Sequence, residues 1–235
     1  RQRLAVRVTV AGVISVLTAF GGIAVFQRQQ ADRQAERATR ARISAEELID
    51  FMTFDLREKL KPIGKLELLQ DTQDEIDAHY ERLDVTDDDP QVIRRRAINF
   101  FNSGELQSSL GDLEAAERFF REGLGILERL VESDPDNPQR HQDLQAGLER
   151  FGGIKVDQGD LPAALKAYEE SRGILEHLAV SSANNDDWRR EVAVNLNKIG
   201  AIKFDQGDLP GALMDYTKAK AIAEGLVAAN GDNTR

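Results

Sequence analysis

The stretch DQGDLP occurs twice in the chain, at residues 157–162 and 205–210, and a shorter relative, LGDLEA, stands at 110–115. A loop with two aspartates and a glycine could bind a metal or a phosphate, or could mark a turn between helices. The Gly-Asp-Leu triplets recur every 48 residues, beginning at Gly111, Gly159 and Gly207. A fixed period in this range is typical of a stacked helical repeat. The spacing therefore favours a turn.

Each residue type in DQGDLP suits the junction of two helices. A glycine at the end of a helix can adopt positive φ, which suits Gly159. An aspartate in the next position, Asp160, can cap the N-terminus of the following helix. Proline in the first turn loses no hydrogen bond there, which suits Pro162. We therefore predict a hinge between paired helices, with no ligand in it.

The repeat predicts three pairs of helices. The first helix of each pair is expected at 91–109, 139–157 and 187–205, and the second at 112–132, 160–180 and 208–229. Small residues stand at fixed places, where they would let two backbones approach, and an aromatic residue would fill the space beside them. This repeat signature comprises Gly104, Gly111, Ala116, Phe120, Gly152, Gly159, Ala164, Tyr168, Gly200, Gly207, Ala212 and Tyr216.

The pattern resembles the tetratricopeptide repeat. The last unit carries the resemblance through Leu196, Ile199, Gly200, Gly207, Ala212, Tyr216 and Ala219. The first unit matches less well, with Ser103 at the leucine position and Gly123 at the last position for a small residue. The period of 48 also exceeds the usual 34 and predicts longer helices. The chain is similar to long-period bacterial arrays, which often follow a membrane helix, an adaptor like residues 45–69 and an upstream signalling domain.

We predict an all-α chain in three parts. Residues 1–27 form a transmembrane helix with a basic flank, and residues 28–85 form a helical juxtamembrane connector. Residues 86–235 form an α-solenoid of three hairpins resembling tetratricopeptide repeats, at about 90–137, 138–185 and 186–235. NGDNTR (230–235) stands where another unit would open, so we expect further repeats in the parent protein.

Residues 8–26, VTVAGVISVLTAFGGIAVF, contain no charge. As a helix they would cover about 28 Å, close to the apolar thickness of a bilayer. A buried soluble helix or a cleaved signal peptide fits less well. Arginines on both sides leave the membrane orientation weakly determined, with a lean towards cytoplasmic repeats. Small residues recur along one face of this helix, at Ala11, Ser15, Ala19 and Gly22. They could let two such helices pack closely, which gives the hypothesis of a homodimer. The alternative is that a membrane helix simply contains small residues.

The sequence of the connector predicts two helices separated by a break. The first could continue the membrane helix or restart at SAEE (44–47), which has the spacing of a capping box, and Pro62 and Gly64 end it. Apolar residues between Leu66 and Leu83 then mark a second amphipathic helix. The apolar faces need a partner, either each other or a second chain. The aspartates at 87–89 are interpreted as a solvated linker.

Composition and motifs exclude several classes of function. The 235 residues have a formal net charge of −10, no cysteine and three histidines, His79, His141 and His177, far apart in sequence. An acidic repeat region without a basic stripe argues against nucleic-acid binding. We find no nucleotide loop, metal motif or nucleophile–base pattern. We therefore expect a chain that is not an enzyme and has no cofactor and no metal.

What remains is recognition of a protein or peptide, whose identity the sequence does not give. In such arrays the first helices line the concave face. Register with the family implies a candidate groove of Ala146, Glu149, Gly153, Val156, Asp157, Val194, Asn197, Ala201, Phe204 and Asp205. The family's clamp for a peptide carboxylate uses Lys and Asn, which this set lacks in part, so a basic or apolar helix suits it better. These residues could instead only support the array.

We therefore interpret the chain as a single-pass, membrane-anchored interaction module, part of a larger bacterial signalling protein. Two alternatives remain. The repeats could drive self-assembly of the anchored chain. The segment could also be the non-catalytic part of an enzyme whose kinase, TIR-like or protease-like effector lies upstream.

Overall fold

The structure, a computed structural model, describes residues 59–82, 89–181 and 186–232, together with residues 28–30, 33, 34, 37 and 40. The chain divides into two compact units, Arg1–Lys59 and Leu60–Arg235. The predicted membrane span, its dimer face and the capping box of the connector lie outside the described residues. Within the described part of the chain, no helix is both long and apolar enough to cross a bilayer.

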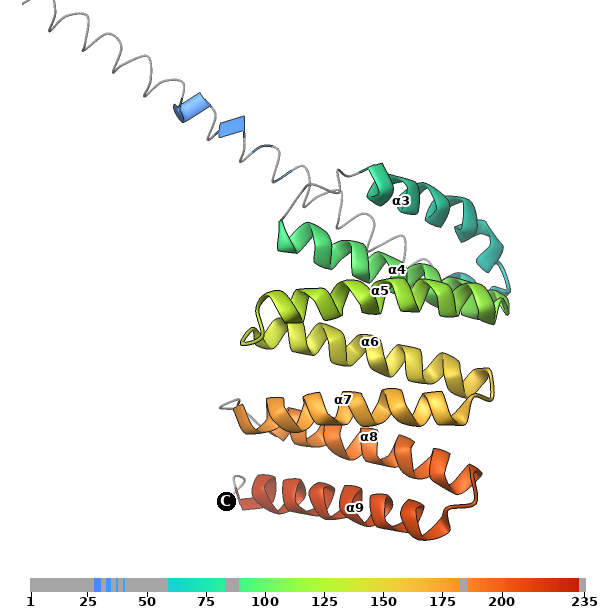
Figure 1. Ribbon diagram of the computed structural model, residues 1–235, viewed down its shortest axis with the longest axis vertical. Helices are drawn as coiled ribbons and strands as arrows, with labels where there is room; N and C mark the ends of the chain where they lie inside the picture. The colour runs from blue at the N-terminus through green and yellow to red at the C-terminus, as the bar shows by residue number, and fades with distance from the viewer. Residues whose placement is uncertain are drawn as a thin grey trace, which may run out of the picture. The chain divides into compact units, whose positions relative to one another are not determined.

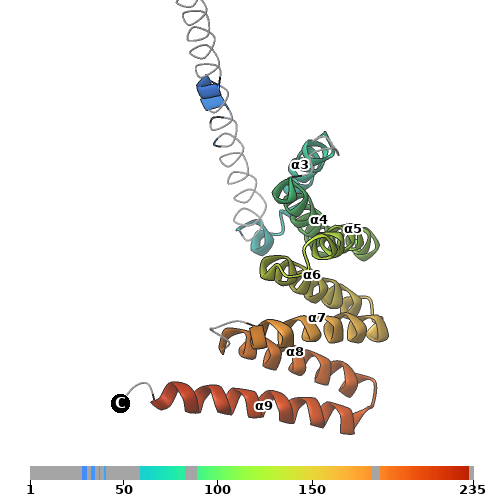
Figure 2. The same ribbon diagram turned by 60° about the vertical axis from the view of Figure 1, so that its left-hand side comes forward.

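In its described residues, the second unit is all-α and builds an array of helix hairpins. Figure 1 shows its helices following one another in a single stack, and Figure 2 shows the same order from another side. The predicted helices are present, with ends that differ from the prediction by three residues or fewer. They are α4 (Pro90–Leu110), α5 (Leu113–Ser133), α6 (Pro138–Asp157), α7 (Leu161–Ser181), α8 (Asp186–Asp205) and α9 (Leu209–Asp232).

The turns within the hairpins have the predicted chemistry. Gly111, Gly159 and Gly207 have φ values of 91°, 76° and 84°, a region that side chains with a Cβ atom rarely adopt. The Asp160 carboxylate accepts a hydrogen bond from the backbone N–H of Ala163 at 3.2 Å. Asp112 and Asp208 cap α5 and α9 in the same way. The prediction that DQGDLP is a hinge is therefore confirmed.

A fourth glycine turn precedes these three. Gly64 has φ of 64° and stands 47 residues before Gly111. It is followed by a 3-10 turn, η3 (Leu66–Leu69), and by α3 (Gln70–Arg82), which corresponds to the second predicted helix of the connector. In register, η3 and α3 take the place that α5 takes in the next hairpin.

The partner of α3 is α4. The Gln73 side-chain amide donates to Ser103 Oγ at 2.9 Å and to Asn99 Oδ1 at 3.0 Å. The Asp77 carboxylate accepts from Asn99 Nδ2 at 2.6 Å and from Ser103 Oγ at 2.8 Å. Polar contacts therefore join α3 and α4, the helices on the two sides of the predicted boundary at residue 86. The sequence had left this partner open.

The small residues of the repeat signature lie where helices approach each other most closely. A Cβ atom built on Gly152 would lie 2.9 Å from Tyr168 Cζ, nearer than real Cβ contacts come. Gly104 meets Phe120 and Gly200 meets Tyr216 in the same way. Ala116, Ala164 and Ala212 are almost completely buried. Each hairpin is therefore closed by an aromatic ring lying over a glycine.

Candidate functional site

The ten predicted groove residues lie on α6 and α8, the first helices of the second and third hairpins. Eight of them are exposed: Ala146, Val156, Asp157, Val194, Asn197, Ala201, Phe204 and Asp205. Glu149 and Gly153 are half-buried. The Phe204 side chain is 58% exposed, so this surface presents apolar as well as polar groups.

Glu149 already has partners inside the array. Its carboxylate accepts hydrogen bonds from Asn195 Nδ2 at 2.8 Å and from Ser171 Oγ at 3.3 Å, and it forms an ion pair with Lys198. These partners belong to α7 and α8. The Lys198 ammonium also lies 5.3 Å from the centre of the Tyr168 ring. Glu149 thus joins consecutive hairpins and is not free to anchor a ligand.

Two further ion pairs connect α4 with α6. Arg94 Nη2 donates to Asp143 Oδ1 at 2.8 Å, and this hydrogen bond raises the pKa of Arg94. Arg150 Nε lies 3.3 Å from a Glu105 carboxylate oxygen. The helix surface that the sequence predicts as a groove is therefore also the surface on which the hairpins are tied together.

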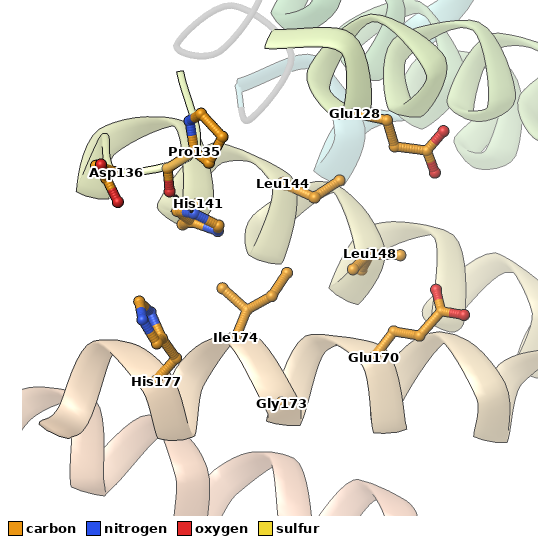
Figure 3. Close-up of a pocket in the computed structure, with 10 residues that line it drawn as sticks. All are labelled: Glu128, Pro135, Asp136, His141, Leu144, Leu148, Glu170, Gly173, Ile174 and His177. Atoms are coloured by element: carbon orange, nitrogen blue, oxygen red, sulfur yellow. Dashed lines mark hydrogen bonds between the residues drawn. The ribbon is translucent and has the colours of Figure 1, made fainter. Parts of the chain in front are cut away.

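A pocket of about 450 Å³ lies elsewhere, between α5 and α7, with α6 as its floor. Figure 3 shows Leu144 and Leu148 of α6 and Ile174 of α7 near its middle, and Glu128 and Glu170 towards one end. The two histidines and Asp136 lie towards the other end. The lining residues are Glu128, Pro135, Asp136, His141, Leu144, Leu148, Glu170, Gly173, Ile174 and His177.

A second pocket of about 380 Å³ adjoins the first. The two share Glu128, Leu148 and Glu170, and together they are called here the α5–α7 groove. None of the ten predicted groove residues lines it. The other residues of the second pocket are Arg121, Leu124, Gly125, Phe151, Ala163, Lys166 and Ala167.

The charges of the α5–α7 groove are unevenly compensated. Within the described part of the chain, Glu128 and Asp136 have no cation within ion-pair distance. Glu170 lies 3.7 Å from Lys166, and both side chains are more than half exposed, so water screens this pair strongly. Arg121 is paired with Glu117 at 2.7 Å. The middle of the groove therefore carries net negative charge over an apolar floor.

The structure brings together two histidines that the sequence analysis had left unpaired. The rings of His141 and His177 lie 5.7 Å apart, centre to centre. His141 Nε2 donates to the carbonyl oxygen of Pro135 at 2.7 Å, which fixes that ring. Each histidine stands eighteen residues from Gly159, on opposite arms of one hairpin. Within the described residues, no group of three or more His, Cys, Asp or Glu side chains could hold a metal ion.

One charged cluster beside the groove holds α5 to α6. Lys155, a buried residue, donates to Gln158 Oε1 at 2.9 Å, and its Nζ lies 2.6 Å from Glu117 Oε2. The hydrogen bond from Lys155, followed by those from Arg121 and Gln158, lowers the pKa of Glu117 to about 2, although burial alone would raise this pKa. These contacts fix one wall of the groove.

Comparisons with known proteins find similar solved structures but do not assign the chain to a family. No family model matches the chain, and no curated protein matches it. Two solved structures of TPR-like repeats, described as a kinesin light chain of Podosopora anserina, are each 10% identical to it. They cover 72% and 73% of this chain and 92% and 93% of their own, with a TM-score of 0.46. BtubC (BKLC) from P. vanneervenii is 15% identical over 79% of this chain and 85% of its own, with a TM-score of 0.40.

Proposed function

We propose that this chain is a membrane-tethered scaffold that binds a segment of another protein in the α5–α7 groove. The observation that carries the proposal is the groove itself, a depression built from two adjoining pockets of about 450 and 380 Å³. It combines apolar side chains with unpaired carboxylates, the mixture by which a pocket fixes and orients a ligand. The ion pair of the buried Lys155 with Glu117 holds one wall, α5, to the floor, so little order has to be created there on binding.

The tether belongs to the proposal and is supported by sequence alone. Residues 8–26 are uncharged, and arginines flank them on both sides. A single-pass anchor there would place the repeats next to a membrane, with a lean towards the cytoplasmic side. The long-period resemblance suggests an upstream effector in a bacterial signalling protein. The chain would then supply recognition to that effector and would itself catalyse no reaction.

The binding function is tested with the full chain in a mild detergent and a display library of random ten-residue peptides. We expect enriched peptides that bind with a dissociation constant in the micromolar range or tighter. Failure to enrich any peptide, or turnover of a substrate by the isolated chain, would overturn the proposal.

The tether is tested separately by membrane extraction. The full chain should remain in the membrane after an alkaline wash, and Leu17→Arg, which places a charge in the middle of the span, should weaken this retention. Release of the unaltered chain by the wash would remove the anchor from the proposal.

A second candidate function, self-assembly, is favoured by one observation on α9. Leu209 and Leu213 are 57% and 68% exposed. Their equivalents one repeat earlier, Leu161 and Leu165, pack into the core that α7 forms with α8. If α9 joined two chains, the full chain should associate in a concentration-dependent way in sedimentation, and Leu213→Glu should abolish this association. A monomer at all concentrations would exclude it.

A further inference from the structure

The α5–α7 groove presents three kinds of surface in a fixed order. One apolar patch is formed by Leu144, Leu148 and Ile174. The carboxylates of Glu128 and Glu170 follow, shared by both pockets. A second stretch follows these carboxylates towards the N-terminal ends of α5 and α7. Arg121 and Lys166 lie at its border, and its apolar residues are Leu124, Phe151, Ala163 and Ala167. The order is therefore apolar, acidic, apolar.

The spacing of these surfaces leaves room for an extended peptide, because the second apolar stretch of α7 runs from Ala167 to Ala163. Along α7, Ile174, Glu170 and Ala167 are separated by four and three residues, or about 6 and 4.5 Å at 1.5 Å per residue. In an extended chain, side chains two residues apart point the same way and lie about 6.6 Å apart. Three alternate side chains of one extended segment could therefore face the three surfaces in turn.

Charge decides what the central side chain must be. Glu128 has no cation within ion-pair distance among the described residues, and Glu170 has only the exposed Lys166 at 3.7 Å. A carboxylate placed between them would meet two like charges, whereas a Lys or Arg would complete an ion pair with each. The histidines at one end of the groove can offer ring nitrogens to the peptide backbone, since both line the same pocket.

We propose that the α5–α7 groove recognises an extended segment with the pattern apolar–x–Lys/Arg–x–apolar. The inference rests on the proposed function and names its ligand class. The first apolar side chain packs on Leu144 and Ile174, the cation lies between Glu128 and Glu170, and the second apolar side chain packs beside Phe151. The two residues marked x face solvent and are unrestricted. Because the pattern is symmetric, it can be read in either chain direction.

The probe is a fluorescein-labelled peptide, Ser-Leu-Ser-Lys-Ser-Leu-Ser, titrated with the full chain in detergent and followed by fluorescence anisotropy. Replacing its lysine by glutamate should abolish measurable binding. Glu128→Gln should weaken binding of the lysine peptide roughly fivefold, the effect of about 1 kcal/mol. Added salt should weaken the binding as well, since the carboxylates are exposed.

Two further variants separate groove binding from general effects. Glu169→Gln removes the same charge from an exposed position of α7 outside the groove, and should leave binding unchanged. Gly173→Leu should block the groove without disturbing the fold, because a Cβ atom at Gly173 meets nothing within 4 Å. We expect at least a tenfold loss of binding with Gly173→Leu, and an unchanged circular dichroism spectrum.

The outcomes distinguish this inference from the function on which it rests. Library peptides that carry the pattern and lose binding with Gly173→Leu support both. Enriched peptides of another pattern, or peptides insensitive to Gly173→Leu and Glu128→Gln, overturn the ligand class and leave the scaffold function standing. A library that yields no binder overturns both.

Discussion

Replacing Gly152 by alanine should destabilise the second hairpin, although alanine is the better helix former. A Cβ atom at Gly152 would lie 2.9, 3.0 and 3.1 Å from three atoms of the Tyr168 ring. That ring is buried, 6% exposed, and packs against Ala164 and Ile199, so it has little room to move. Overpacking of this kind typically costs about 1–3 kcal/mol. The gain in helix propensity offsets about 1 kcal/mol of it.

The matched control is Gly173→Ala, in the second helix of the same hairpin. Its Cβ atom would meet nothing within 4 Å, so only the gain of about 1 kcal/mol in helix propensity remains. The two variants should therefore differ by about 1–3 kcal/mol in the free energy of unfolding. Urea unfolding of the full chain, followed by far-ultraviolet circular dichroism, measures this difference.

The cause is tested with Tyr168→Leu as a background. Without the aromatic ring, Gly152→Ala should lose most of its penalty, because the two changes are coupled through one contact. Equal stability of Gly152→Ala and Gly173→Ala would refute the argument that the ring excludes a side chain. An undiminished penalty in the Tyr168→Leu background would show that the cost arises elsewhere.

Three further outcomes follow from the turns and from the α5–α6 ion pair. Gly207→Ala should lower the free energy of unfolding by about 1–2 kcal/mol in urea, because φ of 84° disfavours a Cβ atom. Asp160→Ala should lower it by about 1 kcal/mol through loss of the cap on α7, and Asp160→Asn should largely restore it. The folded pKa of Glu117, about 2, lies below its ordinary 4.5, so its contribution to stability is complete above pH 4.5 and is lost as the pH falls towards 2. A stability–pH curve should therefore be flatter in that range for Glu117→Gln, and an unchanged slope would contradict the role of Lys155.

The sequence was sufficient for the hairpins because their determinants are local and repeated. Gly159 and Asp160 specify a turn through their own conformational and hydrogen-bonding preferences, and the period of 48 fixes the neighbouring turns. The pairing of Gly152 with Tyr168 follows from the antiparallel arrangement of the two helices. The same reasoning would have paired His141 with His177, since both stand eighteen residues from Gly159.

The α5–α7 groove and the partners of Glu149 could not be predicted in this way. A groove depends on how far apart α5 and α7 are held over α6, which is decided by packing between hairpins. The Glu149 carboxylate is engaged by Asn195 and Lys198, which are 46 and 49 residues further along the chain. Register with a family identifies a helix face, but it does not tell which side chains on that face remain free.

The polar contacts between α3 and α4 have a mechanical consequence. Gln73 and Asp77 hold Asn99 and Ser103 through several hydrogen bonds at once. A force applied to α3 from the N-terminal side would therefore act on α4 as well. A chain that begins at residue 86 would lack these contacts.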